Sequence, residues 1–225
     1  MQRAILKPQK KAYTLMELCV VLCVVALLLV MLPKAFAQVL ASSSQIACMS
    51  SLDQLGGACF LYSENNNGFL PHEDFGSTEP PTDACWYQTL DSTISATPKA
   101  QVKQDPDSIE LDKTLLEDTG FSYKMNSRLE DYKGHKATAS PSFRSVASIP
   151  HPDKTVLFFD GDISKPSIFK LPYGMYLNVV NRHLSKSNLL LLDGQVKSSA
   201  GNSPEEHWKG AGGFLWDPDA AEDQQ

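Results

Sequence analysis

The side chains best suited to acid–base chemistry lie in the second half of the 225-residue chain. Nine residues separate His183 from Asp193, and Asp160 ends an apolar run. A histidine facing a carboxylate across neighbouring strands can exchange a proton with it, but no serine or cysteine stands beside them in a recognisable nucleophile motif. A structural role is therefore favoured over enzymatic activity. Asp193 and Gly194 are expected to form a turn, and His183 to bond backbone or carboxylate and fix the strand register.

The carboxylates of Asp160, Asp162 and Asp193 are of the oxygen type that Ca²⁺ prefers. Their spacing does not follow the EF-hand pattern, and clustered acids are more often a solvated surface. A calcium site on these residues is thus a secondary hypothesis. The chain contains no CxxC pair, which argues against a structural zinc site, and no other cofactor is expected.

Five cysteines offer further chemistry. Cys19 and Cys23 lie in an apolar run and are expected to be small packing residues. Cys48 and Cys59 are eleven residues apart, which is about 16 Å along a helix, so they cannot bridge each other. In an oxidising compartment either one could pair with Cys85 and leave the other as a thiol. The sequence leaves that disulfide open.

The N-terminus has the charge pattern of a membrane anchor. An uninterrupted apolar run covers residues 18–32, and residues 13–16 bring the stretch near the roughly 20 residues that cross a bilayer. Because basic flanks stay cytoplasmic, we expect a single pass through the cytoplasmic membrane with the head on the extracytoplasmic side. The net charge of −6 argues against a nucleic-acid partner. The first eleven residues contain four basic residues and no acid: Arg3, Lys7, Lys10 and Lys11.

Glu17 is the single acid within residues 13–32. A carboxylate inside a membrane helix costs about 2.5–3.5 kcal/mol, so it needs a partner. A cut between Ala12 and Tyr13 would create an α-amino group four residues before Glu17, one helical turn away on the same face. The positive end of the helix dipole would also favour the acid there. Proteolysis would thus supply the missing cation, on the same chain or on a neighbour.

Residues 11–18, Lys-Ala-Tyr-Thr-Leu-Met-Glu-Leu, resemble the processing motif of type IV prepilins and pseudopilins. They depart from it at Ala12, where glycine is usual. The resemblance implies that a prepilin peptidase/N-methyltransferase cuts before Tyr13 and methylates it, and that Glu17 guides assembly. It also implies a homo- or hetero-polymer with other pseudopilins, and inner-membrane partners of a type II secretion-like or type IV pilus-like machine.

Other segments carry the same resemblance. Residues 48–62 and 66–71 look like the helix after the anchor in large pseudopilin-like families. Residues 121–126 and 152–161 look like internal blocks of those proteins. Residues 183–194 resemble the prepilin-processing-associated H-X9-DG motif. The resemblance therefore covers most of the chain and implies a structural filament subunit.

Two alternatives stay open. Residues 35–37, Ala-Phe-Ala, followed by Gln38, have the pattern of a signal-peptidase site, and a mature chain beginning at Gln38 would lose Glu17. A second alternative is a single-pass, membrane-anchored binding or sensory module that does not polymerise. The mature N-terminus distinguishes the first alternative, and cross-linking through the helix distinguishes the second.

The elements that position these residues are expected to form an α+β, pilin-like fold, in which one long N-terminal helix carries an antiparallel sheet. Residues 64–68, Glu-Asn-Asn-Asn-Gly, predict the end of this helix. Beyond Pro33 the helix should continue along an apolar stripe at helical spacing, made of Val39, Leu40, Ile46, Met49, Leu52, Leu55, Cys59 and Phe60.

Four short β runs are expected in the head, at residues 155–159, 176–180, 188–192 and 195–197. The turn at Asp193-Gly194 should join the last two. The expected organisation is a basic leader (1–12), a transmembrane and filament-core helix (13–33), its extracytoplasmic half (34–62), a globular head (63–216) and a disordered acidic tail (217–225).

Overall fold

The computed structural model divides the chain into two compact units, Met1–Ala41 and Ser42–Gln225. The expected leader and the expected tail, apart from Asp217, lie outside the described residues. The described residues are 14–72, 85–95, 102–105, 121–129, 145–162, 173–174, 179–183, 185–199 and 213–217.

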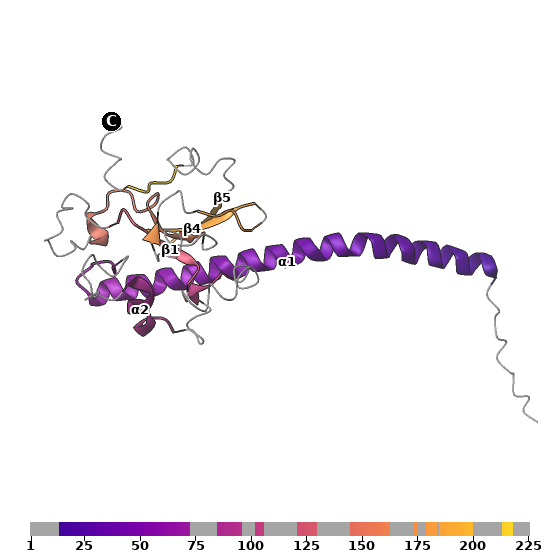
Figure 1. Ribbon diagram of the computed structural model, residues 1–225, viewed down its shortest axis with the longest axis horizontal. Helices are drawn as coiled ribbons and strands as arrows, with labels where there is room; N and C mark the ends of the chain where they lie inside the picture. The colour runs from indigo at the N-terminus through magenta and orange to yellow at the C-terminus, as the bar shows by residue number, and fades with distance from the viewer. Residues whose placement is uncertain are drawn as a thin grey trace, which may run out of the picture. The chain divides into compact units, whose positions relative to one another are not determined.

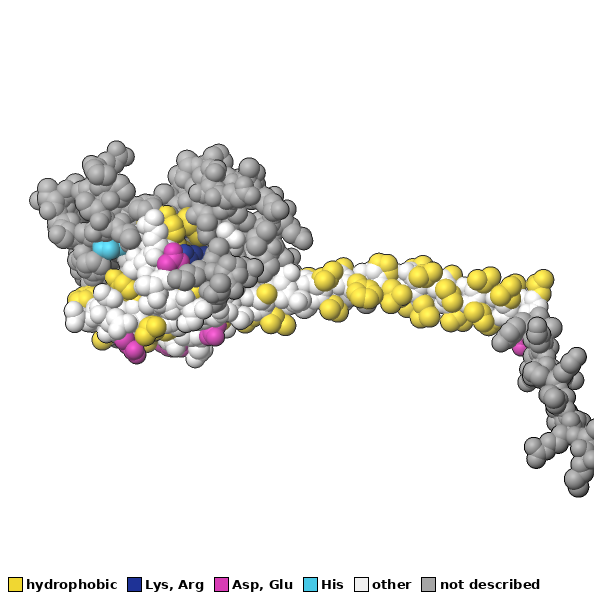
Figure 2. All heavy atoms as spheres, turned by 90° about the horizontal axis from the view of Figure 1, so that it is seen from below, with side chains coloured by type: hydrophobic (Ala, Val, Ile, Leu, Met, Phe, Trp, Pro, Cys, Tyr) yellow, Lys and Arg dark blue, Asp and Glu magenta, His cyan; other side chains and the backbone are white. Residues whose placement is uncertain are grey.

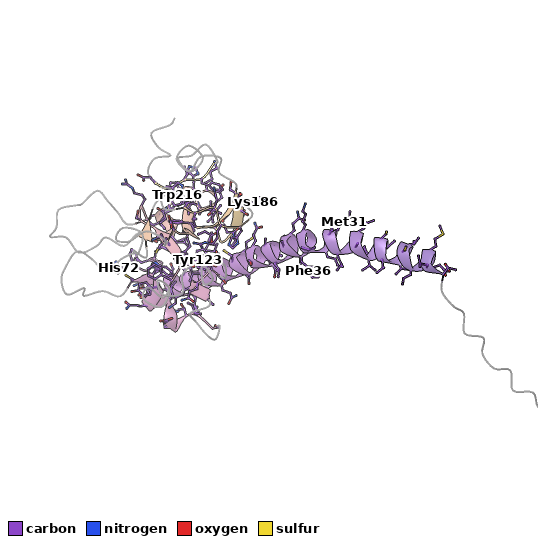
Figure 3. The ribbon with its side chains drawn as sticks, turned by 45° about the vertical axis from the view of Figure 1, so that its right-hand side comes forward. Met31, Phe36, His72, Tyr123, Lys186 and Trp216 are labelled. Carbon is purple, nitrogen blue, oxygen red and sulfur yellow. The ribbon has the colours of Figure 1, made fainter. Side chains whose placement is uncertain are left out.

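Helix α1, Leu15–Asn65, begins in the first unit and ends in the second (Figure 1). As expected, it continues through Pro33. Within the first unit its large apolar side chains are exposed, and Figure 2 shows many of them along the side of the helix in view. Figure 3 shows Met31 and Phe36 pointing away from the helix. Among the described residues α1 is the one helix that is long and apolar enough to cross a membrane, so it is a candidate single membrane span.

The part of α1 in the second unit is amphipathic. Cys48, Leu52, Leu55 and Cys59 are fully buried, and their spacing places them on one face of the helix. The expected stripe is therefore confirmed from Leu52 onward. Gly56, beside this face, lies so close to Leu190 that a Cβ atom there would be 2.9 Å from a methyl of that side chain.

The expected stripe is wrong at its N-terminal end. Val39, Leu40 and Ile46 are about two-thirds exposed, at 66%, 66% and 68%. Val39 and Leu40 belong to the first unit. Ile46 lies two residues before Cys48, about 200° around the helix, so it faces the opposite side. The face that packs in the head begins at Cys48.

The end of α1 confirms the predicted stop. Asn67 and Gly68 have positive φ values of 56° and 84°, and the Gly68 N–H donates to the Ser63 carbonyl at 2.8 Å. Asparagine and glycine adopt this left-handed conformation more readily than other residues. The chain then leaves the helix, and Phe69 forms an isolated antiparallel bridge with Ser145.

A five-stranded sheet lies in the second unit, in the order β3-β1-β2-β4-β5. All neighbouring strands are antiparallel except β1 and β3, which are parallel. With α1, this sheet gives the expected α+β, pilin-like layout. The strands are β1 Tyr123–Asn126, β2 Val156–Asp160, β3 Tyr173–Gly174, β4 Ser187–Leu191 and β5 Val196–Ser199.

Three of the four expected β runs correspond to β2, β4 and β5, each displaced by one or two residues at an end. The fourth, at residues 176–180, falls mostly outside the described residues, and Val179 forms an isolated bridge with Gly161. The block at residues 121–126 contains β1, which the sequence analysis does not predict as a strand.

The sheet is buried on both faces. Leu190 of β4 belongs to the core shared with α1, whereas its neighbours Leu189 and Leu191 belong to a second cluster. Alternation along a strand sends successive side chains to opposite faces. In the second cluster the rings of Phe159 and Trp216 meet edge to face, 5.0 Å apart.

Short helices complete the core that the sheet shares with α1. In α2, Trp86–Thr89, the ring of Trp86 lies 4.9 Å from that of Phe158, edge to face. No helix is expected from the sequence at these residues, so α2 is an addition. Two 3-10 turns, η1 Leu90–Ser92 and η3 Val146–Ser148, also border the core.

Candidate functional site

The H-X9-DG segment corresponds to strand β4 and its two ends. At the C-terminal end, Asp193 Oδ1 accepts a hydrogen bond from the Gln195 N–H at 2.9 Å. Gly194 has φ 88°, a conformation that favours glycine. Strands β4 and β5 pair on either side of this turn. The hairpin expected at Asp193-Gly194 is therefore confirmed.

His183 lies before the other end of β4, and its side chain is buried. Its backbone forms a two-way bridge with Lys186, with N···O distances of 3.0 and 2.8 Å. Its ring Nε2 lies 2.7 Å from Asp105 Oδ2 and 3.9 Å from Asp160 Oδ2. A strand of five residues is about 17 Å long, so β4 separates His183 from Asp193 and the two do not form an acid–base pair.

Cys48 of α1 reaches the same place. Its Sγ lies 3.0 Å from Asp160 Oδ1. One donor atom from each of Cys48, Asp105, Asp160 and His183 lies within 4.8 Å of the others, and all four residues are buried. We call these four residues the buried cluster. Helix α1, the segment 102–105, strand β2 and the segment that precedes β4 each contribute one of them.

Further polar groups hold the cluster in place. The Asn188 side chain donates through Nδ2 to Cys48 Sγ at 3.2 Å, and its backbone N–H donates to Asp160 Oδ2 at 2.7 Å. Arg182 Nη1 lies 3.2 Å from Asp105 Oδ2, and its Nη2 donates to the Gly161 carbonyl at 2.9 Å. The side chains of Cys48, Asp105 and Asp160 are thus oriented by hydrogen bonds or ion pairs with Asn188 and Arg182.

Burial and mutual repulsion dominate the electrostatics of the cluster. Burial raises the pKa of the Cys48 thiol, and the carboxylates of Asp160 and Asp105 raise it further. Burial and Asp105 also raise the pKa of Asp160, against the opposing hydrogen bond from Cys48 and the charge of Arg182. Carrying two carboxylates and a thiolate at once would require more positive charge than Arg182 alone supplies.

The calcium set proposed from sequence is not assembled. Asp160 belongs to the buried cluster at the end of β2. Asp193 lies beside the start of the same strand, where its N–H donates to the Pro152 carbonyl at 3.0 Å. Asp162 acts on Lys124 instead: burial lowers the pKa of that amine, and the negative charge of Asp162 partly opposes the shift. From the sequence the three acids are expected to lie together, but Asp160 is at the end of β2 and Asp193 is near its start, at the opposite end of the sheet.

The disulfide left open by the sequence is not formed. All five cysteines lie in the described part of the chain, and none of them takes part in a disulfide. Cys48 instead directs its Sγ toward Asp160 and Asn188. Cys59 is buried within the core of α1 and the sheet, where burial raises the pKa of its thiol.

Sequence reasoning misses Asp105, a member of the buried cluster, and Arg182, which lies beside it. Asp105 lies in a stretch rich in Pro, Ser and Thr that looks like loops, and no local pattern marks it. Arg182 directly precedes the motif histidine, which is the one signal that could have drawn attention to it. Both residues enter the site through tertiary folding.

At the other end of the chain, the cleavage pair Ala12 and Tyr13 lies outside the described residues. Glu17 and Thr14 form a reciprocal capping arrangement at the start of α1. Glu17 Oε2 accepts from the Thr14 N–H at 2.8 Å and from its hydroxyl at 3.0 Å, and the Glu17 N–H donates to Thr14 Oγ1 at 3.3 Å. The carboxylate therefore points back to the chain that enters the helix.

Comparisons with protein-family models, curated proteins and solved structures found no match to this chain. The site must be interpreted from its geometry. A fully buried thiol with a raised pKa is poorly suited to nucleophilic attack. The arrangement is better suited to holding a cation or to fastening the helix to the sheet.

Proposed function

We propose that this chain is a pseudopilin, a structural subunit of a type II secretion-like or type IV pilus-like filament. Its leader would be removed by a prepilin peptidase, and its head would lie on the extracytoplasmic side. The proposal is supported by the pilin-like α+β layout, in which a continuous helix combines an apolar segment with a face packed in the head. The observation that carries it is the position of the Glu17 carboxylate.

Glu17 Oε2 accepts from the backbone nitrogen of Thr14. The next nitrogen toward the N-terminus belongs to Tyr13, which becomes the free amine if the chain is cut after Ala12. The carboxylate is therefore already at the end of the helix where the new cation would appear. An ion pair there would offset the roughly 2.5–3.5 kcal/mol that a carboxylate costs within a membrane.

Polymerisation would also explain the exposed apolar surface. Residues of the first unit such as Leu22 and Leu29 are 59% and 62% exposed. Lipid covers such side chains in a single anchored subunit, and neighbouring helices can replace it in a filament by close packing. A mature amine on one subunit could then pair with Glu17 of the next.

The first test is the mature N-terminus. We expect N-terminal sequencing and mass spectrometry of the membrane-extracted protein to find a methylated Tyr13. An Ala12→Glu variant should block this cut, whereas Ala12→Gly should leave it intact. A mature chain beginning at Gln38 would refute the proposal, because Glu17 would have been discarded.

The second test uses the native cysteines of the anchor. Cys19 and Cys23 are exposed, whereas Cys48, Cys59 and Cys85 are buried, so a membrane-permeant thiol cross-linker should join subunits through the anchor. We expect ladders with the wild-type chain and a strong loss with Glu17→Ala, while removal of the leader continues. Glu17→Asp, which keeps the charge, is the matched control. Monomer alone in wild-type membranes would favour the anchored, non-polymerising module.

A further inference from the structure

We propose that the buried cluster binds one divalent transition-metal ion of the Zn²⁺ class. The inference goes beyond the filament role and does not depend on it, because the four donor atoms lie within the second unit. The sequence analysis argues against a zinc site, since it finds no CxxC pair. The structure instead brings the donors together from four separate segments.

The spacing of the donors is close to that around a tetrahedral ion, with two pairs that would have to move apart by less than 1 Å. Bonds of about 2.0–2.3 Å place tetrahedral ligand atoms about 3.3–3.8 Å apart. In the cluster, His183 Nε2 lies 2.7 Å from Asp105 Oδ2 and 3.9 Å from Asp160 Oδ2, and Cys48 Sγ lies 3.0 Å from Asp160 Oδ1. All four donor atoms lie within 4.8 Å of one another. Small rotations of the side chains would therefore complete the coordination.

The donor types select the class of metal. A thiolate and an imidazole suit zinc, cobalt and related ions, whereas Ca²⁺ and Mg²⁺ require mostly oxygen ligands. Only the carboxylates of Asp105 and Asp160 would serve the latter ions, which usually take six or more ligands. Full burial of all four residues also fits a closed structural site better than an open catalytic one.

Charge balance favours a dication. Metal binding deprotonates a coordinating thiol and uses neutral imidazole, so Cys48, Asp105 and Asp160 would bring three negative charges. A divalent ion together with the Arg182 guanidinium, 3.2 Å from Asp105, would neutralise them. The metal would thereby offset the cost of burying these acids.

The surrounding groups are those of an outer coordination shell. The Asn188 amide donates to Cys48 Sγ at 3.2 Å, and an N–H donor stabilises a thiolate ligand. The other atom of that amide, Oδ1, is buried and has no hydrogen-bond partner among the described residues. The backbone N–H of Asn188 holds Asp160, and Arg182 holds Asp105. The site is thus positioned by interactions that metal binding can leave in place.

The first experiment needs no substitution. Full-length, tag-free protein would be unfolded with a chelator and refolded in detergent with Co²⁺, a spectroscopic substitute for Zn²⁺. We expect saturation at one Co²⁺ per chain and a thiolate-to-cobalt charge-transfer band in the near ultraviolet. Zn²⁺ should displace the band and raise the midpoint of thermal unfolding, whereas Ca²⁺ should do neither. Refolded protein without the band, or without stoichiometric metal, would overturn the proposal.

Matched variants then locate the ion. Cys48→Ser should abolish the charge-transfer band, while Cys59→Ser, another buried cysteine of α1, should retain it. Asn188→Ala should weaken Co²⁺ binding by about 10–100-fold, as losses of outer-shell partners do. Where a variant does not refold, zinc per chain is measured on protein purified from zinc-supplemented cells. Equal zinc content in Cys48→Ser and wild type would place the metal elsewhere and reject the site.

Discussion

The two halves of α1 form one continuous helix, yet the apolar side chains are exposed in the first half and largely buried in the second. In the first unit Leu22 is 59% exposed, whereas in the second Leu52 is fully buried. The first half is apolar on every face, and the second concentrates its apolar residues on one face that meets the sheet. Periodicity, rather than apolar content, therefore distinguishes a helix that packs within its own chain from one that requires lipid or neighbouring subunits.

The acidic side chains of the two units also differ, in how far along the sequence their hydrogen-bond partners lie. Glu17 finds its hydrogen-bond partners within one turn, at Thr14. Asp160 is surrounded by groups from α1, from residue 105 and from the neighbouring strand β4. Partners within one turn do not require burial, and in the proposed filament the Glu17 carboxylate would remain available to a neighbouring subunit. The partners of Asp160, which are distant in sequence, are brought together only by the complete fold of the head.

The sharpest test of this comparison is a pair of identical substitutions. Leu52→Ala removes a fully buried side chain and should lower the free energy of unfolding of the head by about 2–5 kcal/mol. Leu22→Ala should leave that free energy unchanged and weaken cross-linking between anchors instead. Chemical denaturation in detergent measures both, because Trp86 and Trp216 are buried and their fluorescence reports unfolding. A loss of head stability in Leu22→Ala would break the comparison.

A second test concerns a charge within the head. Burial lowers the pKa of Lys124 to about 8, and Asp162 partly opposes the shift. Between about pH 8 and 10.5 the unfolded chain then binds more protons than the folded one, so this residue's contribution to stability rises with pH. The increase should reach about 3 kcal/mol.

The measurement is the difference in unfolding free energy between wild type and Lys124→Met across that pH range. The advantage of the variant should shrink as the pH rises, because the buried amine of the wild type becomes neutral. Taking the difference between the two proteins cancels the contribution of all other titrating groups to the pH dependence. A constant difference would show that Lys124 titrates normally.

The smallest expected effect comes from two adjacent glycines of α1. A Cβ at Gly56 would lie 2.9 Å from Leu190 Cδ2, whereas a Cβ at Gly57 would meet no atom within 4 Å. Gly56→Ala should therefore cost about 1–3 kcal/mol through overpacking. Gly57→Ala should be neutral or stabilise the helix by up to about 1 kcal/mol. Equal effects would mean that the helix and sheet pack less closely than the structure shows.

Local signals predict much of this fold. Asn67 and Gly68 identify the end of α1, and Asp193 with Gly194 identifies the β4–β5 turn, because each depends on a few adjacent residues. Strand β1 is harder to predict, since it contains Lys124, which is buried although its sequence type suggests exposure. Ile46 is misplaced because it lies about 200° around the helix from Cys48, on the side that faces away from the head.

The candidate site could be predicted only in part. His183 is conspicuous through its spacing from Asp193, but the spacing suggests the wrong partner. Its actual partner, Asp105, lies 78 residues away in sequence, and Cys48 comes from α1. No pattern in one sequence records such convergence, because tertiary packing brings the segments together.

The interval of residues between His183 and Asp193 contains the strand that joins them, β4. One end is fixed by an imidazole in the interior, the other by a turn at the surface, and β4 occupies the distance between them. Inserting a single residue would exchange the two faces of β4, sending Leu190 away from α1 and Leu189 and Leu191 toward it. The length of this interval therefore decides which face of β4 meets α1.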